Sequence, residues 1–266
     1  MTRPARVALV TGAARGIGAA TVDALCAQGY RVLAFDSCAG DEVPVGVRGS
    51  LADRAELEAV AARHPGQVLA HVGDVRDPAA LRAAAASAVA TFGGLDVVVA
   101  AAGVIGGGRP LWETSADEFA SQWEVNALGV WNTAHAVVPH LLAQPDPAGC
   151  RFVAVASAAG ERGMFGLSAY AASKHAVIGI VRGLAADLVG TGVTAVAVAP
   201  GATETAMLQA TAELYQLDDV GELVANQLIR RAITPAEQAA VIALCCSPAG
   251  AALNGSVLRA DGGFVG

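Results

Sequence analysis

Val7-Ala-Leu-Val-Thr-Gly-Ala-Ala-Arg-Gly-Ile-Gly18 decides the fold of this chain, because a short apolar run breaks there into a glycine turn and then a helix. Glycine has no Cβ atom, so the turn can be tight, its backbone can approach a phosphate, and the helix can pack close to the strand. The N–H groups that open the helix favour an anion. The spacing Gly-x-x-x-Gly-x-Gly differs from the Gly-x-Gly-x-x-Gly fingerprint, so residues further along must show whether a dinucleotide binds.

Length, charge and cysteine content narrow the class of protein. A chain of 266 residues fits one large α/β domain, and a net charge of -7 disfavours a nucleic-acid partner. Apolar runs such as Val97 to Ile105 are shorter than the ~20 residues that cross a membrane. Arg3 and Arg6 lead into the first strand without an apolar leader, and the odd set of five cysteines has no Cys-x-x-Cys pair. We expect a cytoplasmic protein with reduced, mostly buried thiols, no membrane partner and no metal site.

Strands alternate with helices along the whole chain. We expect strands near residues 6–10, 31–35, 68–72, 95–99, 152–156, 193–199 and 257–259. A capping box at Ser115-Ala-Asp-Glu118 predicts one long helix that continues to about Leu142. This alternation predicts a single Rossmann-type domain over residues 1–266, a doubly wound parallel sheet of order 3-2-1-4-5-6-7 with helices on both faces.

Candidate ligand-binding residues follow the carboxyl ends of six predicted strands, the edge where such sheets bind ligands. They are Gly12, Asp36, Asp74, Gly103, Ser157 and Pro200. The Asp36 carboxylate would accept hydrogen bonds from an adenosine ribose and repel a 2′-phosphate, which predicts NAD rather than NADP. Arg15 is a contrary indication, but Ser37 supplies no second cation. Asp74, with Val75, either contacts adenine or only leads into the next helix.

Tyr170 and Lys174 lie four residues apart, so they share one face of a helix and both project toward Ser157 at the end of the fifth strand. A phenol with a pKa near ~10 is a poor base at neutral pH. A neighbouring ammonium together with an oxidised nicotinamide cation would favour the phenolate. The spacing therefore predicts a phenol and an ammonium together at the end of the fifth strand.

These residues resemble the short-chain dehydrogenase/reductase family over essentially the whole chain. The shared motifs are Thr11-Gly-x-x-x-Gly-x-Gly18, Asp74, Val125-Asn126, Ser157, Tyr170-x-x-x-Lys174, Pro200-Gly201 with Thr205, and Asp261-Gly-Gly263. The resemblance implies that Tyr170 is the general acid/base, Ser157 holds the substrate oxygen, Lys174 binds the nicotinamide ribose and Asn126 supports a proton-relay water. It also implies hydride transfer between NAD(H) and a secondary alcohol or ketone, and a homotetramer. The expected cofactor contacts are Gly12, Arg15, Gly16, Ile17, Gly18, Asp36, Ser37, Asp74, Val75, Ala101, Gly103, Tyr170, Lys174, Pro200, Gly201, Thr203 and Thr205.

A narrower resemblance is to the mycofactocin-coupled branch of this family. It is carried by the long connection Cys38 to Gly49, the stretches Gly107–Thr114 and Val181–Leu188, and a departure at Ala100 and Ala101, where the family usually has two Asn residues. This branch implies tightly held NAD that a mycofactocin-type acceptor reoxidises. We expect the 38–49 segment to cover adenosine as a lid, the alternative being a disordered surface loop.

The substrate contacts are predicted less directly. The segment 203–231 is rich in Met, Leu and Tyr, so we expect a substrate lid in which Met207, Leu208 and Tyr215 join Ser157; ordinary helix packing is the alternative. The alternative within the same chemistry is a 3-oxoacyl, steroid or terpenoid reductase with freely exchanging cofactor. A non-catalytic dinucleotide sensor is disfavoured by the joint presence of Asn126, Ser157, Tyr170 and Lys174. A sugar-nucleotide epimerase or dehydratase is disfavoured because the sequence lacks a Gly-x-x-Gly-x-x-Gly turn and a larger C-terminal substrate domain.

Overall fold

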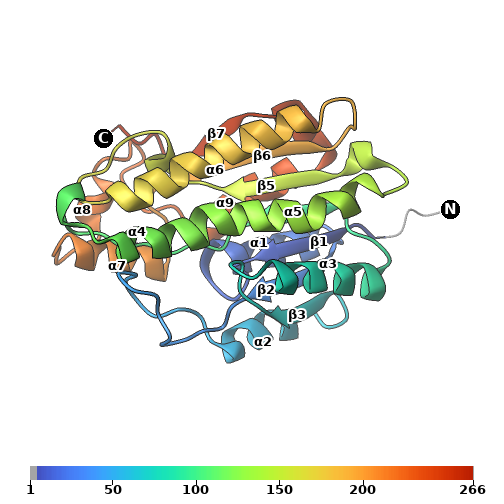
Figure 1. Ribbon diagram of the computed structural model, residues 1–266, viewed down its shortest axis with the longest axis horizontal. Helices are drawn as coiled ribbons and strands as arrows, with labels where there is room; N and C mark the ends of the chain where they lie inside the picture. The colour runs from blue at the N-terminus through green and yellow to red at the C-terminus, as the bar shows by residue number, and fades with distance from the viewer. Residues whose placement is uncertain (1–4, 266) are drawn as a thin grey trace.

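A parallel sheet of seven strands runs through the protein in the order β3-β2-β1-β4-β5-β6-β7 (Figure 1). The computed structural model describes residues 5–265. Arg3, one of the two arginines on which the expectation of no leader rests, lies outside this range. The predicted fold and strand order are confirmed. The strands are β1 (Val7–Thr11), β2 (Arg31–Asp36), β3 (Val68–Val72), β4 (Val97–Ala100), β5 (Arg151–Val155), β6 (Thr194–Pro200) and β7 (Val257–Ala260).

Helices cover both faces of the sheet, because the central strands are apolar on both sides. The helices are α1 (Gly16–Ala27), α2 (Arg54–Ala62), α3 (Pro78–Phe92), α4 (Ala116–Gln122), α5 (Gly129–Leu142), α6 (Ser168–Asp187), α7 (Ala206–Leu214), α8 (Gly221–Val224) and α9 (Pro235–Cys246). One core packs α3, α5 and α6 against the sheet, and a second core packs α1, α2 and α9 against the other face.

The predicted single helix from Ser115 to Leu142 is wrong in its middle. Its capping box is present, but a π-helical turn, Trp123–Leu128, separates α4 from α5. Asn126 lies in this turn, fully buried, with its side chain bonded to the backbone of Val104 at 2.8 and 3.0 Å. The hydrogen bonds to a loop 22 residues away outweigh regular helical geometry, and such turns often mark functional sites.

The 38–49 segment crosses the front of the carboxyl edge of the sheet as a defined strap. Its base is closed by hydrogen bonds between Gly40 and the backbone of Leu51 and Ala52, at 2.8 and 3.0 Å. Its far end pairs with the loop after β4: Val47 forms an antiparallel bridge with Gly106, and the Arg48 N–H donates to the Ile105 carbonyl at 2.9 Å. The segment therefore spans from Asp36 to the loop after β4.

Candidate active site

One cavity of about 910 Å³ lies at the carboxyl edge of the sheet. Every residue predicted to contact cofactor or substrate lines it. Among the candidate catalytic residues, Asn126 alone lies behind its wall. The cavity is within the size range of small-molecule and cofactor sites, roughly 300–1,000 Å³.

The glycine turn forms a backbone cradle at one end of this cavity. Gly12 has φ +66°, and a Cβ atom there would come within 2.7 Å of the Ala102 Cα. A Cβ atom at Gly18 would overlap the Gly12 carbonyl. Within residues 5–265, no side chain caps the N–H groups that begin α1. These N–H groups at the wall of the cavity fit the pyrophosphate of a dinucleotide.

Asp36 and Arg15 have different partners beside this cradle. The Asp36 carboxylate accepts from the backbone N–H groups of Ala14 at 3.0 Å and Cys38 at 3.2 Å, which holds it at the cavity wall. The Arg15 guanidinium donates to the carbonyl of Ser50, just beyond the strap. Arg15 is thus engaged by the chain itself, while the carboxylate faces the cavity.

Asp74 does not cap the helix that follows it. Asp77 caps α3, whereas Asp74 pairs with Arg76 at 2.7 Å and also accepts from the Arg76 backbone N–H at 2.8 Å. Burial tends to raise the pKa of Asp74, but hydrogen bonds and charge from Arg76 lower it overall. The Asp74 side chain lies at the cavity wall beside Val75.

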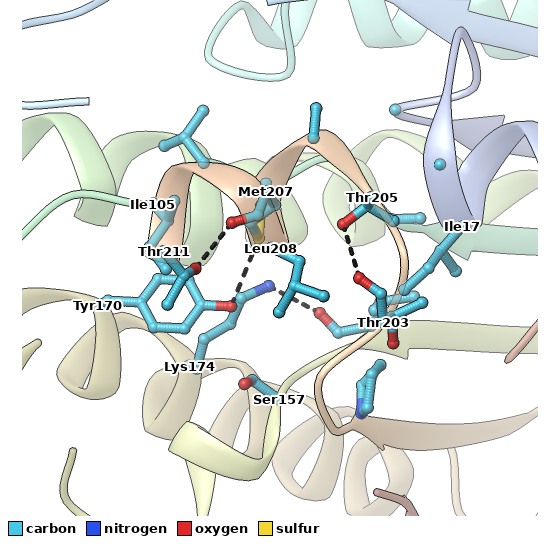
Figure 2. Close-up of a pocket in the computed structure, with 18 of the residues that line it drawn as sticks. Ile17, Ile105, Ser157, Tyr170, Lys174, Thr203, Thr205, Met207, Leu208 and Thr211 are labelled. Atoms are coloured by element: carbon cyan, nitrogen blue, oxygen red, sulfur yellow. Dashed lines mark hydrogen bonds between the residues drawn. The ribbon is translucent and has the colours of Figure 1, made fainter. Parts of the chain in front are cut away.

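Tyr170, Lys174 and Ser157 meet at the opposite end of the cavity (Figure 2). Tyr170 and Lys174 come from α6, and Ser157 directly follows β5. The Lys174 ammonium donates to the Val155 carbonyl at 2.9 Å and lies 5.9 Å from the centre of the Tyr170 ring. The predicted convergence of these side chains is therefore present.

Burial, rather than the charge of Lys174, has the largest effect on the pKa of Tyr170 in this structure. Burial raises the pKa of Tyr170, and a hydrogen bond with Ser157 only partly offsets this. Burial also lowers the pKa of Lys174 to about 8. The ammonium is directed at a backbone carbonyl rather than at the phenol oxygen, so desolvation outweighs charge attraction.

Asn126 braces the loop after β4. Its amide donates to the Val104 carbonyl and to the Ser173 hydroxyl, both at 3.0 Å. A Cβ atom at Gly103 would lie 3.3 Å from the Asn126 oxygen and 3.4 Å from Lys174 Nζ. The side chain therefore fixes Gly103 against Lys174 from behind the cavity, and its own hydrogen bonds go to protein atoms.

Thr11 is a structural residue of the site whose role the sequence did not reveal. Its buried hydroxyl accepts from the backbone N–H groups of Ala101 at 3.1 Å and Ala102 at 3.2 Å. These bonds brace the turn after β4 where the family usually has Asn side chains. Only the pairing of β1 with β4 brings Thr11 to this turn, so the spacing along the chain carries no signal of it.

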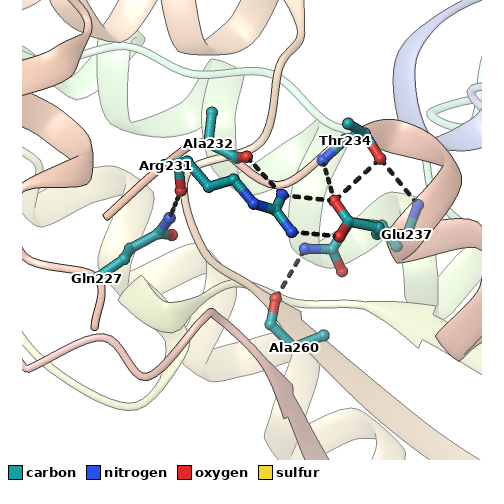
Figure 3. A network of polar contacts seen from close by, with 7 residues as sticks. Gln227, Arg231, Ala232, Thr234, Glu237 and Ala260 are labelled. Atoms are coloured by element: carbon teal, nitrogen blue, oxygen red, sulfur yellow. Dashed lines mark hydrogen bonds and ion pairs between the residues drawn. The ribbon is translucent and has the colours of Figure 1, made fainter. Parts of the chain in front are cut away.

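The 203–231 segment forms a flap over the cavity and is anchored at its two ends; Figure 3 shows the polar contacts at the Arg231 end. Thr203 pairs with Ile233 next to the flap, and the Glu204 N–H donates to the Ile233 carbonyl at 2.9 Å. The buried Gln227 accepts from the Ala202 N–H at 2.6 Å and donates to the Arg231 carbonyl at 2.7 Å. The Arg231 side chain in turn pairs with Glu237 on α9 at 2.6 Å.

The flap and α6 form an apolar chamber around the Tyr170 end of the cavity. The buried residues of this cluster are Ile105, Ala159, Leu167, Tyr170, Ala171, Ala210 and Leu214, with Met164, Met207 and Tyr215 packed against them. The Tyr215 hydroxyl donates to the Phe165 carbonyl at 2.6 Å, so it is already satisfied. Leu208 is buried beside this chamber, and Thr205 closes against Gly16 of the cradle.

Three features concern other classes of site. No group of three or more His, Cys, Asp or Glu residues within 5–265 could hold a metal ion. None of the helices described in this range is long and apolar enough to cross a membrane. All five cysteines are free thiols, and four of them are buried, as the sequence predicted.

The fold and the cavity define a dinucleotide-binding α/β protein with a tyrosine, a lysine and a serine at one end of the site. A family model described as enoyl-(acyl carrier protein) reductase matches residues 12–265. An uncharacterized NAD-dependent oxidoreductase of Mycobacterium tuberculosis is 36% identical over 211 residues, 77% of this chain and 74% of the relative. The chain belongs to the short-chain dehydrogenase/reductase family.

Other similar proteins include a named dehydrogenase and two solved structures that contain a nicotinamide cofactor. (-)-trans-Carveol dehydrogenase of Rhodococcus erythropolis is 35% identical over 206 residues, 77% of this chain and 73% of the relative. A short-chain dehydrogenase from Mycobacterium paratuberculosis bound to NAD superposes with a TM-score of 0.86 at 27% identity, covering 98% and 97% of the two chains. A metagenomic blue fluorescent protein in complex with NADPH gives 0.83 at 31% identity, with 99% of each chain covered. The protein is therefore an NAD(P)-dependent oxidoreductase of this family.

Proposed function

We propose that the protein transfers a hydride between NAD(H) and a secondary alcohol or ketone, with Tyr170 as the general acid/base. The observation that supports this is the meeting of Tyr170, Ser157 and Lys174 at the end of the cavity that is otherwise apolar. The nicotinamide, when bound, supplies or accepts the hydride. The substrate would lie between Tyr170 and the 203–231 flap, in contact with Met207, Leu208 and Tyr215.

The side chains at this end have complementary proton chemistry. Tyr170 Oη donates its proton to the carbonyl oxygen during reduction and takes it back from the hydroxyl during oxidation. Ser157 would hold the same substrate oxygen, and its hydrogen bond to Tyr170 lowers the cost of the phenolate. Lys174 Nζ would bind the nicotinamide ribose and add positive charge near Tyr170. Asn126 acts through the loop that it braces.

The cradle residues would hold the remainder of the cofactor. Pyrophosphate fits the N–H groups at the start of α1, and the ribose and adenine fit beside Asp36 and Asp74. The contacts we propose are Gly12, Arg15, Gly16, Ile17, Gly18, Asp36, Ser37, Asp74, Val75, Ala101, Gly103, Pro200, Gly201, Thr203 and Thr205, all at the cavity wall.

The test is a screen of cyclic, terpenoid, steroid and short-chain secondary alcohols with NAD, following NADH absorbance and, in parallel, reduction of an artificial dye acceptor. Turnover of at least one alcohol is the expected result. A folded protein that binds NAD but oxidises no alcohol and reduces no ketone would instead fit the dinucleotide sensor.

The family resemblance also implies a homotetramer, which sedimentation velocity would reveal.

Cofactor choice follows from Asp36. We expect the unaltered protein to prefer NAD, because the carboxylate repels a 2′-phosphate and Arg15 is bound to the Ser50 carbonyl. Replacing Asp36 by Ala together with Ser37 by Arg should shift the preference toward NADP by at least about tenfold, since one charge is removed and its opposite added. Titration of both nucleotides measures the ratio.

A matched control for this pair is Asp41→Ala, which removes an exposed carboxylate within the strap and should leave the ratio unchanged. Equal affinity of the unaltered protein for NAD and NADP would show that Arg15 outweighs Asp36.

Slow cofactor exchange is the second property that we propose. Ala39 and Pro44 of the strap line the cavity, and the strap is attached both at its base and at the loop after β4. Release of NAD would require these attachments to open, so the strap should slow dissociation more than capture. An acceptor of the mycofactocin type, which reoxidises bound NADH in place, would then sustain turnover.

The variant that tests this has residues 42–49 replaced by two glycines, which keeps the closed base at Gly40 and Ala52. We expect the unaltered protein to retain NAD through purification. It should exchange bound NAD with labelled NAD at least about tenfold more slowly than the variant, because contacts of the strap over the cofactor lower the dissociation rate. A purified protein that contains no nucleotide and performs many turnovers with free NAD alone would rule out the proposal and favour an ordinary reductase with freely exchanging cofactor.

A further inference from the structure

Met207 covers the one atom on which the proposed chemistry depends. The Tyr170 hydroxyl donates to the Met207 sulfur at 3.9 Å, and Figure 2 shows the flap residue above the phenol oxygen. Met207 belongs to α7, 37 residues further along the chain than Tyr170. The flap thus places a soft apolar group against the phenol oxygen, on the side away from the sheet.

A substrate oxygen must take the place of this contact. Proton exchange requires an oxygen within about 2.6–3.2 Å of Tyr170 Oη, and Ser157 already approaches from the other side. The sulfur therefore has to move aside when an alcohol binds. Methionine is unbranched and has three rotatable side-chain bonds, so it can do so without unfolding the helix.

The backbone of Met207 is held while its side chain has room to move. The Thr211 hydroxyl donates to the Met207 carbonyl at 2.7 Å, and the two ends of the flap are tied to the sheet edge and α9. Leu208 beside it is buried, whereas Met207 itself is half-buried and lines the cavity. The Met207 side chain, more than the flap as a whole, can therefore adjust the space at Tyr170.

We propose that Met207 determines which alcohols reach Tyr170. Its thioether covers the Tyr170 hydroxyl when no substrate is bound. Once displaced, it packs against the substrate groups attached to the carbinol carbon. The surrounding walls, Ile105 and Leu167, are apolar, so the group that fits beside Met207 is an uncharged hydrocarbon. This inference rests on the proposed function, and it assigns size selection at that site to one side chain.

The experiment compares kcat/KM for 2-butanol and for a 2-substituted cyclohexanol in the unaltered protein and its variants, with NAD and a dye acceptor present. Met207→Ala should raise the ratio of bulky to small alcohol by about tenfold or more, because changes of this size in an apolar pocket give roughly 10- to 200-fold discrimination. Met207→Phe should lower the ratio. Met207→Leu, close in volume, should stay within about threefold of the unaltered protein.

Gln209→Ala is the matched control, because Gln209 lies on the exposed side of the same helix and should leave the ratio unchanged. An active protein whose ratio stays the same in both Met207→Ala and Met207→Phe would overturn this inference alone. A folded unaltered protein that binds NAD but turns over no alcohol or ketone of the wider screen would overturn the proposed function and the inference with it; turnover of other alcohols of the screen but of neither test alcohol would overturn the inference alone.

Discussion

Replacing Tyr170 by Phe is expected to lower kcat by about 10²- to 10⁴-fold, the contribution typical of a positioned acid/base group. The substitution removes one hydroxyl and its proton but keeps the ring, which packs in the buried cluster with Ile105 and Leu167. NAD binding should stay almost unchanged, because little contact area is lost. Steady-state kinetics with the best alcohol of the screen and titration of NAD measure both effects.

The matched control for this substitution is Leu167→Val, which trims the same buried cluster without touching the phenol hydroxyl. It should lower the free energy of unfolding by about 1 kcal/mol and reduce kcat far less than Tyr170→Phe does. A Tyr170→Phe protein that keeps more than about a hundredth of the unaltered kcat would refute the acid/base assignment.

Gly12→Ala is expected to weaken NAD binding by at least about 100-fold. The left-handed backbone at Gly12 costs a residue with a Cβ atom about 1–2 kcal/mol. The added Cβ atom would also meet the Ala102 backbone at 2.7 Å, and the Thr11 hydroxyl holds that backbone in place. About 1.4 kcal/mol corresponds to a tenfold change in affinity. The backbone cost and the displaced turn together should therefore lower the affinity for NAD by at least about two tenfold steps.

Gly29→Ala separates the backbone effect from the loss of the cradle. Gly29 also has a positive φ, +82°, but nothing lies within 4 Å of its added Cβ atom. This variant should unfold at a lower temperature and still bind NAD normally. The measurements are thermal unfolding and the NAD content and affinity of each purified variant. Equal NAD affinity in the two variants would mean that the turn at Gly12 is not the phosphate cradle.

Features that rest on short-range patterns can be predicted from the order of residues alone. Strand order follows from the alternation of apolar strands and amphipathic helices, because right-handed crossovers leave few topologies. Tyr170 and Lys174 share a face because four residues make about one helical turn. Asp36 and Gly12 both line the cavity because the carboxyl ends of parallel strands gather at one edge of the sheet.

Features that depend on atoms far apart along the chain emerge only when the chain is packed. The π-helical turn at Asn126 exists because Val104 lies across from it, and the turn after β4 is braced by Thr11 from another strand. The pKa of Tyr170 is raised because several elements close around it, which no local spacing encodes. The Met207 contact has the same origin: desolvation and steric access are properties of the packed volume, so they appear only when the 203–231 flap meets α6.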